Sequence, residues 1–183
     1  MTLWLVRHAR PLIAPGVCYG ALDVPADATA TRHAAANLAA VLPEGVTMIS
    51  STLQRCELLA QSIQALRPDL TYKIDVRLTE MNFGSFEGIP WDSIAISAYD
   101  AWTADFWCHR FGGKESLADL MSRVASAWDE AHAQGQSQVW VTHAGVIRAS
   151  RLLAYGVRQV ERADQWPVDA PGFGQWCALQ AQA

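Results

Sequence analysis

Two arginines and two histidines stand at positions in this sequence where they can bind and transfer a phosphoryl group. Arg7 and His8 follow the apolar run at the start of the chain. His143 directly follows a second apolar run, and Arg55 comes soon after a third. The planar arginine fork pairs with two phosphate oxygens, and a neutral imidazole can attack phosphorus. These residue types indicate a phosphate pocket.

The elements that must position these residues are read from periodicity. Strands are predicted at 1–6, 47–49, 71–76 and 138–142, with helices over 28–42, 53–66, 117–131 and 144–154 and a last strand near 175–179. Asp27 or Thr29 is expected to cap the first helix, and Ser50 or Ser51 the second. Alternating strands and helices predict an α/β fold, a three-layer sandwich with a mostly parallel central sheet and helices on both faces.

The reactive site of such a sheet lies at the carboxyl ends of its strands. His8 and His143 both follow strands at that edge, and Arg55 opens a helix there, where free N–H groups already favour anions. We therefore expect these side chains to converge. Residues 77–113 are irregular and rich in glycine and aromatic side chains, and they are expected to form a small helical cap over the site. The prediction is one domain, 1–183, with this segment as its cap.

Four blocks of the sequence resemble the histidine phosphatase superfamily, also called the phosphoglycerate-mutase-like superfamily. They are Leu5–Ala9, Ser51–Arg55, Leu78–Gly88 and Val141–Arg148, and they follow in the family's order over residues 3 to about 156. Within the family, the segment Cys18-Tyr19-Gly20, with Asp23 and Pro25, is similar to the α-ribazole phosphatase branch.

The resemblance implies a role for each matching residue. His8 corresponds to the nucleophile that becomes a phosphohistidine, and Glu80 to the acid that protonates the leaving oxygen. Arg7, Arg55 and His143 correspond to the remainder of the phosphate pocket. Tyr19, Gly20 and Ala144 are expected to contact the substrate. Glu87 is the competing carboxylate, for which a structural role is expected.

The sequence departs from the family pattern at several positions. Ala9 and Ala144 replace the glycines that usually follow the two histidines, and Leu59 replaces a frequent threonine. Lys114 interrupts the usual Gly-Gly-Glu-Ser block, and His33 replaces a common glutamine. None of these changes removes a group with an implied chemical role.

The expected activity is a metal-independent phosphomonoesterase acting on a small-molecule phosphate ester, with α-ribazole 5'-phosphate of cobalamin nucleotide-loop assembly as the substrate. The alternatives are a broad-specificity or sugar-phosphate phosphatase and, in another class, a phosphate-binding protein without turnover. Four aromatic side chains can either stack on a benzimidazole ring or fill the core of the cap: Trp102, Phe106, Trp107 and Phe111.

The composition of the chain limits the classes of partner and the cellular location that we expect. The net charge of −4 argues against a broad nucleic-acid surface, and no run approaches the roughly 18 apolar residues of a membrane span. Arg7 interrupts the first apolar run too early for a signal peptide, and the four cysteines include no Cys-x-x-Cys pair. We expect a cytoplasmic enzyme with no cofactor and no metal; the oligomeric state stays open.

Overall fold

A five-stranded sheet with the strand order β3-β2-β4-β1-β5 lies at the centre of the fold. The structure is a computed structural model, and it describes residues 1–180. The strands are β1 (Thr2–Arg7), β2 (Thr47–Ser50), β3 (Tyr72–Ile74), β4 (Gln138–Thr142) and β5 (Trp176–Gln180). The first four run parallel, and β5 adds an antiparallel edge beside β1. The predicted α/β class with a mostly parallel sheet is confirmed.

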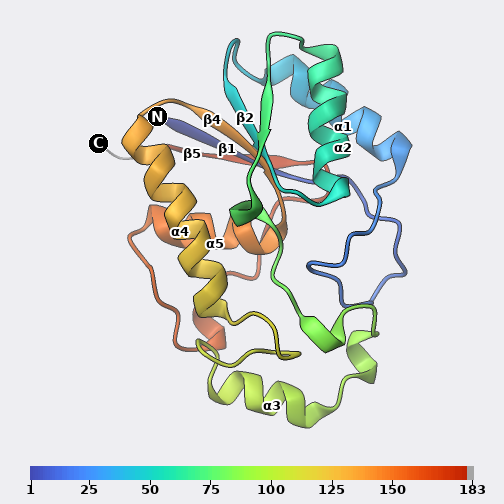
Figure 1. Ribbon diagram of the computed structural model, residues 1–183, viewed down its shortest axis with the longest axis vertical. Helices are drawn as coiled ribbons and strands as arrows, with labels where there is room; N and C mark the ends of the chain where they lie inside the picture. The colour runs from blue at the N-terminus through green and yellow to red at the C-terminus, as the bar shows by residue number, and fades with distance from the viewer. Residues whose placement is uncertain (181–183) are drawn as a thin grey trace.

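Two pairs of helices cover the two faces of the sheet (Figure 1). They are α1 (Ala28–Val41) with α2 (Gln54–Leu66), and α4 (Leu117–Gln134) with α5 (Ala144–Ala154). Successive side chains of a strand point to opposite faces, so Leu5 packs with α4 and α5 whereas Val6 packs with α1 and α2. All five residues of β4 are buried, as expected for a central strand covered on both sides.

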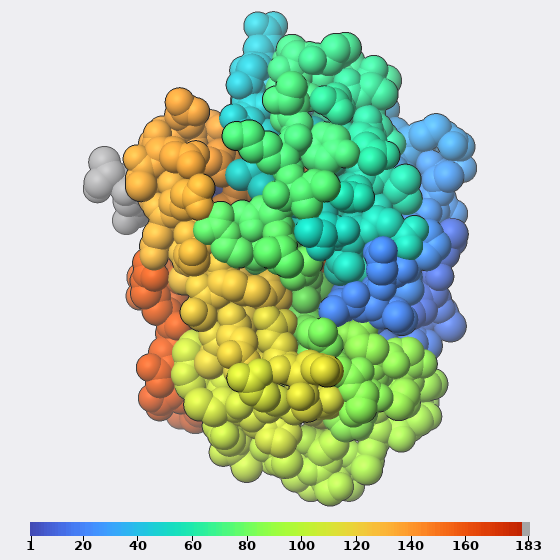
Figure 2. Space-filling view, in the orientation of Figure 1, coloured from blue at the N-terminus to red at the C-terminus, as the bar shows by residue number. Residues whose placement is uncertain are grey.

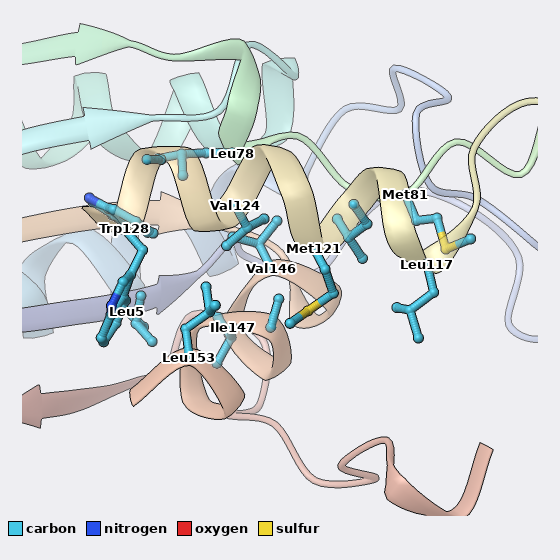
Figure 3. Close-up of a cluster of buried hydrophobic side chains, with 14 of the residues drawn as sticks. Leu5, Leu78, Met81, Leu117, Met121, Val124, Trp128, Val146, Ile147 and Leu153 are labelled. Carbon is cyan, nitrogen blue, oxygen red and sulfur yellow. The ribbon is translucent and has the colours of Figure 1, made fainter. Parts of the chain in front are cut away.

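The larger core lies between the sheet, α4 and α5 (Figure 3). α4 begins at a capping box in which Ser116 and Asp119 satisfy each other's backbone N–H groups. One stripe of α4, including Val124, packs with Val146 and Ile147 of α5. This packing fixes α5, and therefore the residues at its first turn, against the carboxyl end of β4.

Residues 83–113, the part of the predicted 77–113 cap that we call the cap from here on, lie at the opposite end of the molecule from α1 and α2 (Figures 1 and 2). They hold an aromatic cluster of their own, and several of their rings line the same cavity as His8. The cap contains α3 (Ile96–Ala104). Phe111 is fully buried at the centre of the cluster, and Trp102 stacks on it with ring centroids 4.4 Å apart. The cap thus contributes a wall of rings next to the sheet's reactive edge, and the assignment of 1–183 to one domain stays a prediction.

Most element boundaries differ from the predictions by three residues or fewer, and two of the differences have a visible cause. β3 ends at Ile74 because the Asp75 side chain accepts from Arg77 N and starts a short 3-10 turn. The predicted serine cap of α2 is wrong, since Leu53 occupies the N-cap position without a side-chain hydrogen bond. Asp23, from a distant loop, accepts from Gln54 N at 2.8 Å instead. Asp27 does cap α1. Among residues 1–180, no helix has the length and apolar character that a membrane crossing requires.

Candidate active site

His8 and His143 come together because β1 and β4 are parallel neighbours. Arg7 pairs with Thr142 at the ends of the two strands, and each histidine is the next residue along its chain. The backbone N–H of His8 donates to Thr142 O at 3.0 Å, which continues the ladder one step further. The two imidazole rings lie 5.1 Å apart between centroids. The predicted convergence at the carboxyl edge of the sheet is confirmed for this pair.

His8 is held as a neutral imidazole with one free nitrogen lone pair. Its Nδ1 lies 2.7 Å from Ala9 O, and because a carbonyl only accepts, Nδ1 carries the hydrogen. Nε2 is therefore the unprotonated nitrogen. Burial, and then the charge of Arg55, lowers the pKa of His8 from 6.5 to about 3. The ring is thus in the form that a nucleophile needs.

Arg7 and Arg55 place guanidinium groups near the imidazole of His8. Arg55, in the first turn of α2, is fully buried and donates to Leu22 O at 2.8 Å and Gly20 O at 2.5 Å. Arg7 donates to Pro171 O at 3.1 Å and lies 4.0 Å above the ring of Phe173. An arginine has five N–H donors, so both groups retain donors for an anion.

Glu80 reaches the same cavity from the chain that follows β3. Its Oε2 accepts from Gly145 N, and its Oε1 from Met81 N, each at 3.0 Å. A Cβ on Gly145 would lie 2.2 Å from Glu80 Oε1, so this approach requires glycine there. The first turn of α5 therefore fixes where the carboxyl group of Glu80 lies.

His143 lies behind His8. It is completely buried, its Nε2 is 2.8 Å from Ser51 Oγ, and Cys56 Sγ lies 3.4 Å from the same nitrogen. Burial, and then the neighbouring His8, holds the pKa of His143 well below 6.5. His143 is not among the described residues that line the cavity, so in this structure its direct neighbour there is His8 and not open space.

The cavity has a volume of about 330 Å³ and two chemically different ends. Arg7, His8, Arg55 and Glu80 line the polar end. Five aromatic side chains line the other: Phe83, Trp91, Trp102, Phe106 and Trp166. Of the four aromatic residues left open between ring stacking and cap core, Trp102 and Phe106 face the cavity, whereas Phe111 is cap core and Trp107 packs against the main core.

The three residues predicted to contact substrate have different positions. Tyr19 lines the cavity, with its ring 5.4 Å from the Arg55 guanidinium carbon, and burial raises its pKa, which keeps the phenol neutral. Ala144, the first residue of α5, also lines the cavity. Gly20 does not; a Cβ there would lie 1.8 Å from Met81 O, so its visible role is close packing of two loops.

Glu87 has the structural role that was expected of it. Its carboxylate accepts four backbone N–H groups at 2.8 to 2.9 Å, from Gly20, Ala21, Leu22 and Phe83. A carboxylate with these partners ties the Tyr19 loop to the start of the cap. It is therefore already engaged in holding the wall of the cavity.

Among the residues in or beside the cavity that the sequence did not single out, Arg148, Trp166 and Phe173 lie where they can affect a ligand. Arg148 lies one turn after Ala144 on α5 and lines the same cavity, a placement that helical spacing alone indicates. Trp166 lines the cavity, and the ring of Phe173 lies 5.5 Å from that of His8. Both belong to an irregular tail, where no periodic signal points to a site. Within residues 1–180, no group of three or more His, Cys, Asp or Glu side chains is arranged to hold a metal ion.

Comparison with known proteins agrees with this geometry. The family model of the histidine phosphatase superfamily, branch 1, matches residues 3–171. None of the curated proteins matches the chain. Mycobacterial glucosyl-3-phosphoglycerate phosphatase, solved in its native form, is similar with a TM-score of 0.80 and 24% identity, over 97% of this chain and 88% of that one. Its complex with inorganic phosphate is similar to the same degree, with a TM-score of 0.80, 24% identity and coverage of 98% and 89%. The protein TTHB049 from Thermus thermophilus is similar with a TM-score of 0.71 and 28% identity, over 98% of this chain and 93% of that one.

Proposed function

Since this chain belongs to the histidine phosphatase superfamily, branch 1, and is accordingly a phosphoric monoester hydrolase, we propose that His8 is its nucleophile and Glu80 its general acid. The observation that carries the proposal is the polar end of the cavity. A buried neutral imidazole with a free Nε2 lies there between two guanidinium groups, in a space that Glu80 also lines.

The reaction has two steps. In the first, the Nε2 lone pair attacks phosphorus, the bond to the ester oxygen breaks, and Glu80 gives a proton to that oxygen. In the second, the Glu80 carboxylate takes a proton from water as the water oxygen attacks phosphorus, and the P–N bond breaks to return the lone pair to His8. Arg7 and Arg55 stabilise the charge on the equatorial oxygens in both steps, so the mechanism uses no metal and no cofactor.

His143 completes the phosphate pocket in this proposal. Its neutral ring lies against His8 and is held by Ser51. Because burial, and then the neighbouring His8, lowers the pKa of His143, its ring is neutral and acts through hydrogen bonding and packing, not as a second cation. Tyr19 and Ala144 contact the bound ester from the cavity wall.

The substrate that we propose is α-ribazole 5'-phosphate. The support is the aromatic end of the cavity, where Trp102 and Phe106 offer apolar ring surface to a flat base while the phosphate lies at the polar end. The sequence similarity of Cys18-Tyr19-Gly20 to the ribazole branch adds to it, because Tyr19 lies in the cavity wall.

A sugar phosphate that carries a second anionic group is the other candidate. Arg148 favours it, because a third guanidinium lines the cavity although α-ribazole phosphate has only one anionic group. The mycobacterial relative acts on a substrate of this kind, glucosyl-3-phosphoglycerate. A broad-specificity phosphatase would accept both classes.

A steady-state panel of phosphomonoesters separates these candidates. We expect kcat/KM for α-ribazole 5'-phosphate to exceed the values for glucosyl-3-phosphoglycerate and for 4-nitrophenyl phosphate by roughly a hundredfold or more, a difference of about 3 kcal/mol in transition-state binding. A preference for the glycerate ester would favour the second candidate, and similar values for all three would favour broad specificity. No turnover of any ester, with phosphate still bound, would identify a binding protein.

We also propose a cytoplasmic location and small-molecule partners only. All four cysteines lie within the described residues, and none forms a disulfide there. Three of them are buried or half-buried, which is typical of cysteines that pack as small apolar side chains.

A further inference from the structure

Arg123, on α4, holds the backbone that carries Glu80. Its guanidinium donates to three carbonyl oxygens in this segment: Arg77 O at 2.8 Å, Thr79 O at 2.6 Å and Glu80 O at 3.2 Å. Segment 77–80 is a short 3-10 turn followed by irregular chain, so its carbonyls have no regular ladder to join. One side chain therefore satisfies acceptors that would otherwise be left unpaired.

Glu115 completes this arrangement. Its carboxylate pairs with Arg123, from Nε to Oε1 at 2.6 Å and from Nη2 to Oε2 at 3.1 Å, and it also accepts from Asn82 N at 2.9 Å. Both side chains are mostly buried, with 19% and 15% of their surface exposed, so the pair is largely shielded from solvent. The result is a bracket that fixes the chain on both sides of Glu80.

Glu80 has little freedom to compensate if this bracket moves. Its carboxyl group is held by Met81 N on its own chain and by Gly145 N on α5. A shift of the 79–82 backbone would carry Met81 N along with Glu80 but would leave Gly145 N in place on α5. Arg123 is not among the described residues that line the cavity with His8; it lines a separate hollow that Glu80 also borders, so its route to the reacting atoms runs through Glu80.

We infer that Arg123 and Glu115 are positioning residues for proton transfer by Glu80. This inference rests on the proposed function, in which Glu80 is the general acid. A displacement of about 1 Å at a catalytic group can cost up to roughly a hundredfold in rate, so the bracket matters for catalysis even where the fold survives without it.

The chain contains a matched control for this arrangement. Arg67, at the C-cap of α2, also donates to three carbonyl oxygens, those of Ala39, Leu42 and Pro43, and also pairs with a carboxylate, Asp69. It lies at the opposite end of α2 from Arg55, roughly 18 Å away along the helix axis. A variant of Arg67 reports the general cost of weakening such a bracket.

The test uses two esters that differ in the need for an acid. The leaving group of 4-nitrobenzyl phosphate is an alkoxide, which needs a proton from an acid. The leaving group of 4-nitrophenyl phosphate is a stabilised phenolate, which does not. The rate of phosphoenzyme formation is measured by single-turnover rapid quench for wild type, Arg123→Lys, Glu115→Gln and Arg67→Lys. Lysine keeps the charge but has fewer donors, and Glu115→Gln gives an independent reading if Arg123→Lys does not fold.

We expect Arg123→Lys and Glu115→Gln to slow the nitrobenzyl ester at least roughly tenfold more than the nitrophenyl ester, and Arg67→Lys to show no such selectivity. Equal losses for the two esters, or the same selectivity in Arg67→Lys, would overturn the inference. Glu80→Gln measured in parallel separates the two levels of argument. If Glu80→Gln slows both esters equally, the assignment of Glu80 as the acid is wrong. If Glu80→Gln slows the nitrobenzyl ester more but Arg123→Lys and Glu115→Gln do not, only the positioning role fails.

Discussion

The two ends of the cavity are built in different ways. Arg7, His8 and Arg55 at the polar end stand at strand ends or in the first turn of a helix, where the sheet determines their position. The rings at the aromatic end come from the cap and the tail, and Trp102 stacks on two other rings of the cap, Phe106 and Phe111. The sheet is common to this fold, whereas cap and tail are open to change.

This difference separates reaction from substrate. The rigid edge of the sheet places the proposed nucleophile and the cations, so in this account it determines that phosphorus is attacked. The cap determines which leaving group lies next to the phosphate. The variants below should therefore affect the rate of phosphoryl transfer at one end and substrate preference at the other.

The largest expected effect is that of His8→Ala. Removing the nucleophile should lower kcat by at least roughly ten-thousandfold with every ester, while the circular dichroism spectrum stays that of the folded protein. His33→Ala, an exposed histidine on α1, is the matched control and should retain full activity. A folded His8→Ala protein with normal turnover would remove His8 from the mechanism.

Glu80→Gln should have the next largest effect, and it should depend on the ester. Glutamine keeps the size and the ability to accept from Gly145 N but carries no transferable proton. With an alkyl ester such as α-ribazole phosphate the single-turnover rate should fall by roughly a hundredfold to ten-thousandfold. The loss with 4-nitrophenyl phosphate should be much smaller. Steady-state rates do not serve here, because in the proposed mechanism Glu80 also assists hydrolysis of the phosphoenzyme.

Gly145→Ala tests whether a single methyl group can misplace the acid. The three heavy atoms nearest to the added Cβ all belong to the Glu80 carboxyl group, so the fold should tolerate the change. We expect roughly a ten- to hundredfold loss with alkyl esters. In a Glu80→Ala background the clash is absent, and the same substitution should cost almost nothing further. An equal cost in both backgrounds would mean that α5 itself is disturbed.

At the aromatic end, Trp102→Leu should alter binding more than chemistry. We expect KM for α-ribazole phosphate to rise roughly three- to tenfold, which corresponds to about 0.5–1.5 kcal/mol of aromatic contact, with kcat nearly unchanged. Inhibition by inorganic phosphate, which occupies only the polar end, should not change. Trp107→Leu is the control, since Trp107 does not line the cavity. A lower kcat at constant KM would mean that the cap supports the reacting groups.

The last expected effect is on stability against acid and not on activity. The pKa of His8 is about 3 in the folded protein against an ordinary 6.5, so between these pH values the unfolded chain binds a proton that the folded chain does not. The free energy of unfolding should therefore decrease as the pH falls from 6.5 towards 3. His8→Ala removes this contribution, and its acid-unfolding midpoint, followed by circular dichroism, should lie at lower pH than that of wild type. A midpoint at higher pH would show that His8 is not buried as a neutral base.

The sequence predicts most of the polar end well because Arg7, His8 and Arg55 are tied to regular elements. Glu80 lies in irregular chain and is indicated by the family motif alone. Once β1 and β4 are parallel neighbours, His8 and His143 must meet, and helical spacing brings Arg148 onto the side of Ala144. No regular element determines the positions of the rings at the aromatic end. Nothing in the spacing of Trp102, Phe106 and Phe111 shows which ring faces the cavity, since cap residues pack by tertiary contacts over irregular chain.

Long-range partners account for the errors of local prediction. Ser50 and Ser51 have the right type and position to cap α2, yet Asp23 of the Tyr19 loop accepts the first helical N–H, and Ser51 is in contact with His143. Arg123 shows no sign in the sequence of serving segment 77–80, because its partners are backbone carbonyls that any residues would supply. Contacts of this kind are visible only after folding.

Trapping the phosphoenzyme tests the central claim most directly. Enzyme mixed with a 32P-labelled ester is quenched in alkali within one turnover, and the labelled peptide is identified by mass spectrometry. We predict one phosphoryl group on His8, stable in alkali and lost in acid as a phosphoramidate is, and no label in His8→Ala. Label on another residue, or burst-free turnover with no covalent intermediate at any quench time, would contradict the account.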